Sequence, residues 1–252
     1  MPYELTVFLC FVFFAVVSYL LGSINFAIIT TKLFTGNDVR DSGSGNAGMT
    51  NVMRTAGFLP GVITFAGDFL KAIAACALGK YALTPLITAL VPDVATTEIG
   101  LFSITPLTPF IGGSIAGLFC ILGHIFPVFF GFRGGKGIVT AAGTMVILDP
   151  RIFAIEITIF LIIFLCTRII SISSIIAAGC YPVVSFLCFE VLSPVGKLNE
   201  AACNMENPPA PVGLTVALGA LIAAVVVIIK HKDNIIRLVH HEEAKLTLKK
   251  NK

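Results

Sequence analysis

Residue types that suit anion binding gather in one polar segment, residues 38–57, which reads DVRDSGSGNAGMTNVMRTAG between apolar stretches. Its glycines permit positive φ and close approach of the backbone to a ligand, and its hydroxyl, amide and guanidinium groups supply hydrogen bonds. The letters GSGN alone would equally suit a flexible linker. Arg40 and Arg54 favour an anion site, because a linker needs no placed cations.

A second motif, FRGGKG at residues 132–137, carries Lys136 among glycines and precedes the start of a predicted helix, IVTAAG. The glycines could orient successive N–H groups into a concave anion site, to which Lys136 and the helix N-terminus add positive potential. The pattern GxxxxGK[ST] of a Walker loop is absent, which disfavours a nucleoside triphosphate. The alternative is a basic loop at the edge of a membrane.

Two further polar segments follow, RIISISS at 168–174 and HKDNIIR at 231–237. The serines could cap a helix or, beside Arg168, hydrogen-bond a phosphate or carbonyl group. His231 and Asn234 are three residues apart and would share one face of a helix, which Arg237 continues. A basic helix lying on anionic lipid would explain the cations but not the amide and imidazole as well.

Other ionisable residues leave two interpretations open. Asp68 and Lys71, three apart on a predicted helix, could pair with each other or line a polar cavity, and the cost of charge in a membrane favours the cavity. His124 is predicted as a hydrogen-bonded core residue rather than a site residue. The tail at residues 240–243, HHEE, is predicted to be solvated.

No Ser/His/Asp triad, HExxH motif or pair of catalytic carboxylates emerges from the sequence. The groups available are cationic and hydrogen-bonding, which suits a polar phosphorylated molecule that meets a lipid-soluble partner. No metal and no cofactor are predicted. No nucleic-acid partner is indicated, because the basic residues are dispersed at the predicted helix ends rather than in a continuous tract.

The composition predicts an integral membrane protein. Hydrophobic residues make up 56% of the 252 residues, charged residues only 12%, and the mean hydropathy is +0.96. The apolar runs are continuous rather than alternating, which predicts helices and not a β-barrel. The seven cysteines form no CxxC pair and are expected to be small buried hydrophobes. We expect one domain, residues 1–252.

These elements predict an all-α bundle of seven transmembrane helices that holds the polar segments at one end. The expected spans are residues 5–29, 61–78, 109–130, 138–148, 152–167, 169–192 and 212–229. Residues 80–108 are expected to be a connection with room for a short surface helix, and residues 193–211 a loop. Most Lys and Arg residues fall on the side of the four polar segments, which predicts a cytoplasmic site and C-terminus and an external N-terminus.

Taken together, these segments resemble the PlsY family of bacterial acyl-phosphate:glycerol-3-phosphate acyltransferases. The likeness covers nearly the whole chain, in the family's order. The matching segments are GSIN at 22–25, residues 38–57, GDFLKA at 67–72, GHIFPVFFGFRGGKGIVT at 123–140, RIISISS and HKDNIIRL. The departures from the family pattern are Asn25, Met49, Ala72, His241 and an apparent insertion at 91–108. None removes a cation or hydroxyl of the proposed site.

The resemblance implies a seven-helix bundle that transfers a fatty acyl group from acyl phosphate to the sn-1 hydroxyl of glycerol 3-phosphate. The product would be lysophosphatidic acid, made at the cytoplasmic face of the bacterial inner membrane for phospholipid synthesis. The implied partners are these two substrates and membrane lipid, with no obligate protein partner. The implied catalytic residues are Ser44, Ser173, Ser174, His231 and Asn234. The implied substrate-binding residues are Asn46, Asn51, Arg54, Gly134, Gly135, Lys136, Gly137 and Arg237.

Acyl phosphate is a mixed anhydride with a good leaving group, so positioning and charge stabilisation are expected to do most of the catalytic work. His231 could act as general base, or a phosphate oxygen could accept the proton while His231 orients the substrate. A transporter of a phosphorylated solute is an alternative that would need polar groups across the membrane. A lipid-binding scaffold is another, and it would tolerate Lys136→Ala and Arg54→Ala.

Overall fold

The computed structural model describes residues 3–91, 108–192 and 212–245, and every regular element in these ranges is helical. The helices are α1 (Tyr3–Ser23), α2 (Phe26–Thr35), α3 (Met49–Thr55), α4 (Phe58–Leu90), α5 (Thr108–Ile125), α6 (Ile138–Leu148), α7 (Pro150–Thr167), α8 (Ile170–Phe186), α10 (Val212–Lys230) and α11 (Lys232–Val239). Short 3₁₀ turns occur at η1 (Val39–Asp41) and η3 (Val128–Phe130), and α8 continues into a π-helical segment, η4 (Leu187–Val191).

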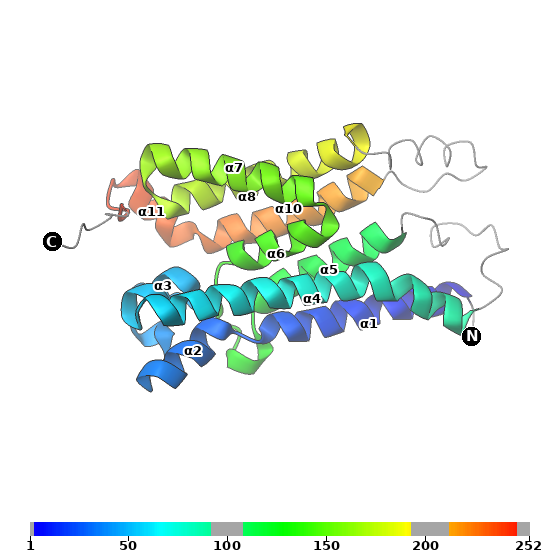
Figure 1. Ribbon diagram of the computed structural model, residues 1–252, viewed down its shortest axis with the longest axis horizontal. Helices are drawn as coiled ribbons and strands as arrows, with labels where there is room; N and C mark the ends of the chain where they lie inside the picture. The colour runs from blue at the N-terminus through cyan, green and yellow to red at the C-terminus, as the bar shows by residue number, and fades with distance from the viewer. Residues whose placement is uncertain (1–2, 92–107, 193–211, 246–252) are drawn as a thin grey trace.

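The bundle consists of two groups of helices with α6 between them (Figure 1). Helices α1, α4 and α5 pack on one another, and α8 packs on both α7 and α10. Helix α6 contacts α4 and α5 on one side and α7 on the other, and α10 also reaches α5. Most apolar side chains of α7 face outward, as expected for a helix in lipid.

The first predicted span is divided in two. Residues 5–29 were expected to be one run, but α1 ends at Ser23 and α2 begins at Phe26. Asn25 lies between them in extended conformation, and its side chain accepts the N–H of Ile28, which caps α2. A polar residue within an apolar run thus starts a new helix.

Helix α4 is longer than predicted. The sequence suggested an end near residue 78 and a connection from Lys80, but the helix continues to Leu90, through Pro85. Lys80 is accommodated because its Nζ donates to the carbonyls of Ile147 (2.6 Å) and Leu148 (3.1 Å). The predicted surface helix in the rest of this connection, and the loop at 193–211, lie outside the described residues.

Six helical stretches among the described residues are long and apolar enough to cross a membrane. They cover residues 3–35, 58–90, 108–130, 150–167, 170–191 and 212–230. The seventh predicted span is α6, an apolar helix of 11 residues. At 1.5 Å per residue it is about 16 Å long, roughly half of a 30 Å hydrocarbon layer. The seven-helix count therefore remains a prediction for α6. The turn predicted at residues 149–151 is confirmed, because Asp149 caps α7 and Pro150 occupies its first position.

Asp68 and Lys71 form an ion pair in the bundle rather than line a polar cavity. Lys71 Nζ lies 2.7 Å from Asp68 Oδ1, 3.1 Å from His124 Nδ1 and 2.6 Å from the carbonyl oxygen of Ile24. All three ionisable side chains are buried. The prediction that favoured a cavity was wrong, and the expected core position of His124 is confirmed. We call Asp68, Lys71 and His124 the buried cluster.

The six cysteines within the described ranges are free thiols, and four of them, Cys10, Cys76, Cys120 and Cys188, are buried as predicted. Cys180 is half-buried, and Cys166 is exposed on α7. Figure 1 shows that α1 starts at one end of the bundle and that α2, α3 and α11 are all at the other end. The polar segments identified in the sequence are therefore at one end of the molecule.

Candidate active site

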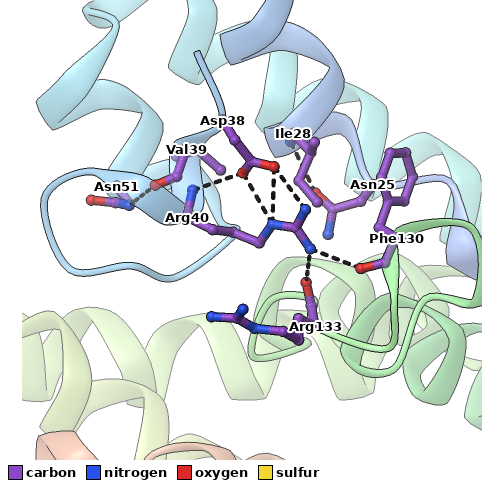
Figure 2. A network of polar contacts seen from close by, with 8 residues as sticks. All are labelled: Asn25, Ile28, Asp38, Val39, Arg40, Asn51, Phe130 and Arg133. Carbon is purple, nitrogen blue, oxygen red and sulfur yellow. Dashed lines mark hydrogen bonds and ion pairs between the residues drawn. The ribbon is translucent and has the colours of Figure 1, made fainter.

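The side chain of Asn51, on α3, organises the polar segment at 38–57. Its Nδ2 lies within hydrogen-bonding distance of the carbonyls of Val39 (3.0 Å), Ser42 (2.9 Å) and Asn46 (3.1 Å). Its Oδ1 accepts the N–H of Ser44 at 2.9 Å. Figure 2 shows the bond to Val39. Because its amide is fully engaged and only 2% exposed, Asn51 shapes the loop, and the predicted direct contact with substrate would require these bonds to break.

Arg40 joins this loop to the glycine motif (Figure 2). Its Nε and Nη2 donate to the carboxylate of Asp38 at 2.7–3.1 Å, and its Nη1 donates to the carbonyls of Phe130 (2.7 Å) and Arg133 (3.3 Å). Hydrogen bonding to Arg40 holds the pKa of Asp38 below its usual value. Arg40 therefore connects the loop at residues 38–57 to the loop that contains the glycine motif, and Asp38 neutralises its charge.

The other predicted residues of the first loop have freer side chains. Ser44 is exposed and Asn46 is half-buried. Arg54, in the last turn of α3, is exposed and forms no ion pair with any residue that the structure describes. No hydrogen bond joins the side chains of Ser44 or Arg54 to the glycine motif or α11 within these ranges. Arg54 thus offers an uncompensated positive charge at the polar end.

The glycine motif packs against the end of α5. The N–H of Gly134 donates to Ile125 and that of Gly135 to His124, both at 3.2 Å. These two N–H groups do not form the anion site that the sequence suggested, because they already donate hydrogen bonds to carbonyl oxygens of α5. A Cβ at Gly134 would overlap the carbonyl of His124, so glycine is needed for close packing. Gly137, at φ +88°, makes the turn into α6, whose first N–H groups have no partner within the helix.

Lys136, between these glycines, points to α11, where its Nζ donates to Oδ1 of Asn234. Burial lowers the pKa of Lys136 to about 8, and the negative charge of Glu243 opposes that shift. At neutral pH the ammonium group is therefore still mostly charged. Its partner Asn234 is neutral, so the charge of Lys136 is not neutralised by direct pairing.

Glu243 completes this group, although the sequence suggested a solvated tail. Its Oε1 accepts from Asn234 Nδ2 (2.7 Å) and Ser171 Oγ (2.8 Å), and its Oε2 accepts from Arg237 Nε (2.7 Å). Burial alone would raise the pKa of Glu243, but these hydrogen bonds hold it below its usual value. The carboxylate therefore ties the start of α8 to α11. We call Lys136, Asn234, Arg237 and Glu243, together with His231, the terminal cluster.

His231 precedes α11 and is 2% exposed. Its Nδ1 lies 2.8 Å from the carbonyl oxygen of Val227, which can only accept a hydrogen bond. Nδ1 therefore carries the proton, and Nε2 keeps its lone pair. Burial lowers the pKa of His231 to about 4, so the ring is neutral at neutral pH. A neutral imidazole with a free Nε2 can accept a proton or a hydrogen bond.

The two predicted catalytic serines lie in the first turns of α8 and are buried. Ser173 Oγ donates to the carbonyl of Ile169 at 2.9 Å, and no side chain caps α8, so the alternative of a serine cap is wrong. Ser174 lines an apolar cavity between α6, α7, α8 and α10, with a water-accessible volume of about 80 Å³. The polar end and an apolar cavity therefore meet at Ser174.

The contacts form one chain: Arg40 connects the first loop to the glycine motif, Lys136 connects this motif to α11, and Glu243 connects α11 to α8. Ser171, Glu243 and Arg40 were not among the predicted site residues. Of these three, only Arg40 and Ser171 could have been proposed from the sequence, because each lies inside a polar motif.

Comparison with known proteins gives a consistent match. The family profile described as glycerol-3-phosphate acyltransferase matches residues 12–241. A glycerol-3-phosphate acyltransferase of Clostridioides difficile is 33% identical over 95% of this chain and 97% of its own length. One from Syntrophomonas wolfei is 36% identical over 92% of this chain and 95% of its own length.

Solved structures agree. The glycerol 3-phosphate form of PlsY, an integral membrane glycerol 3-phosphate acyltransferase, is 30% identical, with a TM-score of 0.67 over 94% of this chain and 96% of that one. Its lysophosphatidic acid form gives a TM-score of 0.66 at 28% identity, over 94% and 95% of the two chains. By sequence and by structure, this chain belongs to the PlsY family of glycerol-3-phosphate acyltransferases.

Proposed function

We propose that this membrane protein transfers a fatty acyl group from acyl phosphate to the sn-1 hydroxyl of glycerol 3-phosphate, releasing lysophosphatidic acid and phosphate. The observation that carries the proposal is the junction at Ser174, where an end rich in cations meets an apolar cavity. The reaction needs that junction, because one substrate is a small anion and the other carries a hydrocarbon chain. The PlsY structures with glycerol 3-phosphate and lysophosphatidic acid support the same assignment.

Three groups are suited to hold the two phosphates. Lys136 provides a charge whose only side-chain partner among the described residues is an amide, the N-terminus of α6 follows it directly, and Arg54 provides a second free charge. Arg237 contributes less, because Glu243 already pairs with it. Ser44 and Asn46 are placed on the loop beside the glycine motif to complete the hydrogen bonds.

In the transfer, the hydroxyl oxygen attacks the acyl carbon, an ester C–O bond forms, and the C–O bond to the phosphate breaks. The phosphate leaves with the electron pair, so the chain need not supply a nucleophile. Lys136 and Arg54 stabilise the negative charge on the leaving group, and Asn234 orients Lys136. The hydroxyl proton passes to Nε2 of neutral His231 or to a phosphate oxygen.

The acyl chain lies in the apolar cavity beyond Ser174, between α6, α7, α8 and α10. Its side-chain lining is almost entirely apolar, so hydrocarbon binds there with release of water. The polar end faces the cytoplasm of the bacterial inner membrane. The excess of Lys and Arg in the segments at that end supports this orientation.

The test is to incubate the purified protein in lipid with glycerol 3-phosphate and either palmitoyl phosphate or palmitoyl-CoA, and to follow lysophosphatidic acid by mass spectrometry. We expect product from acyl phosphate alone, with the acyl group at the sn-1 position. Product from the thioester alone would overturn the proposed donor. No product from either, with the protein shown to be folded, would overturn the reaction.

A further inference from the structure

One carboxyl group in the cavity plays no part in the terminal cluster. Glu156, on α7, is 4% exposed, and neither of its oxygens has a hydrogen-bond partner among the described residues. Twelve of the other fourteen cavity-lining residues are apolar, and the remaining two, Ser174 and Tyr181, carry hydroxyl groups. A buried carboxyl without a partner is costly and rare in native proteins, which points to a role for Glu156 in what the cavity binds.

Glu156 lies in the part of the cavity away from the terminal cluster, and on α7 only Phe153 lines the cavity further from that cluster. Ile138 directly follows the glycine motif, Ser174 is the last residue of RIISISS, and Val227 lies about one helical turn before His231, so these residues mark the near end. Tyr181 is seven residues beyond Ser174 on α8, which corresponds to about 10 Å along the helix. Helix α7 runs antiparallel to α8, so the end of α7 at Thr167 and the start of α8 at Ile170 are at the same end of the bundle. Glu156 is as many residues from Thr167 as Tyr181 is from Ile170. The two residues therefore lie at about the same depth.

We propose that Glu156 is a specificity-determining residue that limits the length of the acyl chain this enzyme prefers. The inference rests on the proposed function, since it takes the cavity as the acyl-chain site. A chain that stops before Glu156 leaves room for water beside the carboxyl. A longer chain covers the carboxyl with methylene groups and leaves it without any hydrogen-bond partner.

The depth of Glu156 in the cavity determines which acyl-chain lengths bring hydrocarbon into contact with its carboxyl group. An extended chain advances a little over 1 Å per bond, so an octanoyl chain spans about 10 Å. It therefore ends near the carboxyl, whereas a palmitoyl chain must pass it. Removing the carboxyl should favour the long chain and leave the short one nearly unaffected.

The test measures kcat/KM for octanoyl phosphate and palmitoyl phosphate in the same preparation, so that the ratio does not depend on the folded fraction. Glu156→Leu and Glu156→Met, which both remove the carboxyl, should raise the palmitoyl-to-octanoyl ratio about tenfold. Glu156→Gln keeps a polar group and should leave the ratio near the wild-type value. Thr158→Leu is the matched control, because Thr158 lies on α7 but is exposed and outside the cavity.

Normal octanoyl turnover with an unchanged ratio in both Glu156→Leu and Glu156→Met would overturn the assignment while leaving the proposed function intact. An equal shift in Thr158→Leu would also overturn it. Failure of the folded wild-type protein with both donors would overturn the proposed function, and the role of Glu156 with it.

Discussion

The buried cluster and the terminal cluster contain the same chemical groups, a lysine, a carboxylate and a histidine, in different settings. In the buried cluster, Lys71 and Asp68 lie 2.7 Å apart with side chains only 4% and 3% exposed, and His124 is beside them. In the terminal cluster, Lys136 contacts a neutral amide, and the carboxylate of Glu243 is taken up by three other side chains.

The difference lies in whether positive charge is neutralised. Asp68 and Lys71 compensate each other inside the bundle, where no anion from solution reaches them. Lys136 keeps its charge at the end of the molecule, next to a helix N-terminus that also favours anions. The types of residue present therefore do not distinguish a structural cluster from a candidate binding site. The two differ in whether the positive charge is neutralised and in whether an anion from solution can reach it.

The largest effect is expected from breaking the buried pair. Lys71→Ala leaves the Asp68 carboxylate uncompensated in the bundle and should reduce the free energy of unfolding by about 3–5 kcal/mol. The measurement is the shift in Tm of the purified protein in detergent. The double variant Asp68→Leu/Lys71→Met removes both charges and should recover most of the loss. Equal destabilisation by the double variant would contradict the interpretation as a compensated pair.

Replacing the lysine of the terminal cluster by alanine should lower activity rather than stability. Lys136→Ala should lower kcat/KM for glycerol 3-phosphate about 10²- to 10³-fold, because a charge that stabilises the phosphates is lost. Its Tm should stay close to the wild-type value, since no buried charge is left unpaired. A variant with normal turnover would mean that this end is not the catalytic site.

A smaller effect is expected at the carboxylate that holds the terminal cluster together. Glu243→Gln keeps the shape but weakens charge-assisted hydrogen bonds from Arg237, Asn234 and Ser171, and should lower kcat about ten- to hundredfold. Glu242→Gln is the matched control, because Glu242 is the exposed neighbour. Similar losses in both variants would show that the tail acts through its overall charge only.

The smallest effect is a pH dependence. The pKa of Lys136 is lowered to about 8, so the free enzyme loses this charge as pH rises through 8. We expect kcat/KM to be about 25-fold lower at pH 9.5 than at pH 7.5, and Lys136→Arg to remove this alkaline limb because arginine stays protonated. With the pKa of His231 lowered to about 4, no change in kcat is expected near pH 6.5. A limb at that pH that is abolished in His231→Gln would contradict the neutral imidazole, whereas a limb that remains in this variant belongs to the substrate phosphates.

Much of the fold could be predicted from hydropathy, because α5, α7 and α10 each lie within an uninterrupted apolar run. The predicted ends failed where a polar residue was satisfied by tertiary contacts. Lys80 suggested the end of a helix, but the carbonyls of Ile147 and Leu148 in the last turn of α6 accept hydrogen bonds from its Nζ. Asn25 was hidden in an apolar run, yet it caps α2.

For the candidate site, the sequence predicted which polar segments would lie at the same end of the bundle. Lys136, Asn234 and His231 meet as expected, because their segments lie at the same end of the bundle. Glu243 was missed because its neighbours make the tail look solvated, and only the fold brings it to Ser171. Gly134 and Gly135 were expected to bind anions through their N–H groups. In the structure these groups donate to carbonyl oxygens at the end of α5, and only the fold brings the two segments together.

The most direct test of the uncompensated charge is the binding of glycerol 3-phosphate, measured by isothermal titration calorimetry for the wild-type protein, Lys136→Ala and Lys80→Met. Lys80 is the matched lysine, because it too is partly buried but donates to backbone carbonyls. We predict that Lys136→Ala weakens binding at least tenfold and that Lys80→Met leaves Kd unchanged. Equal Kd values for the wild-type protein and Lys136→Ala would contradict the account.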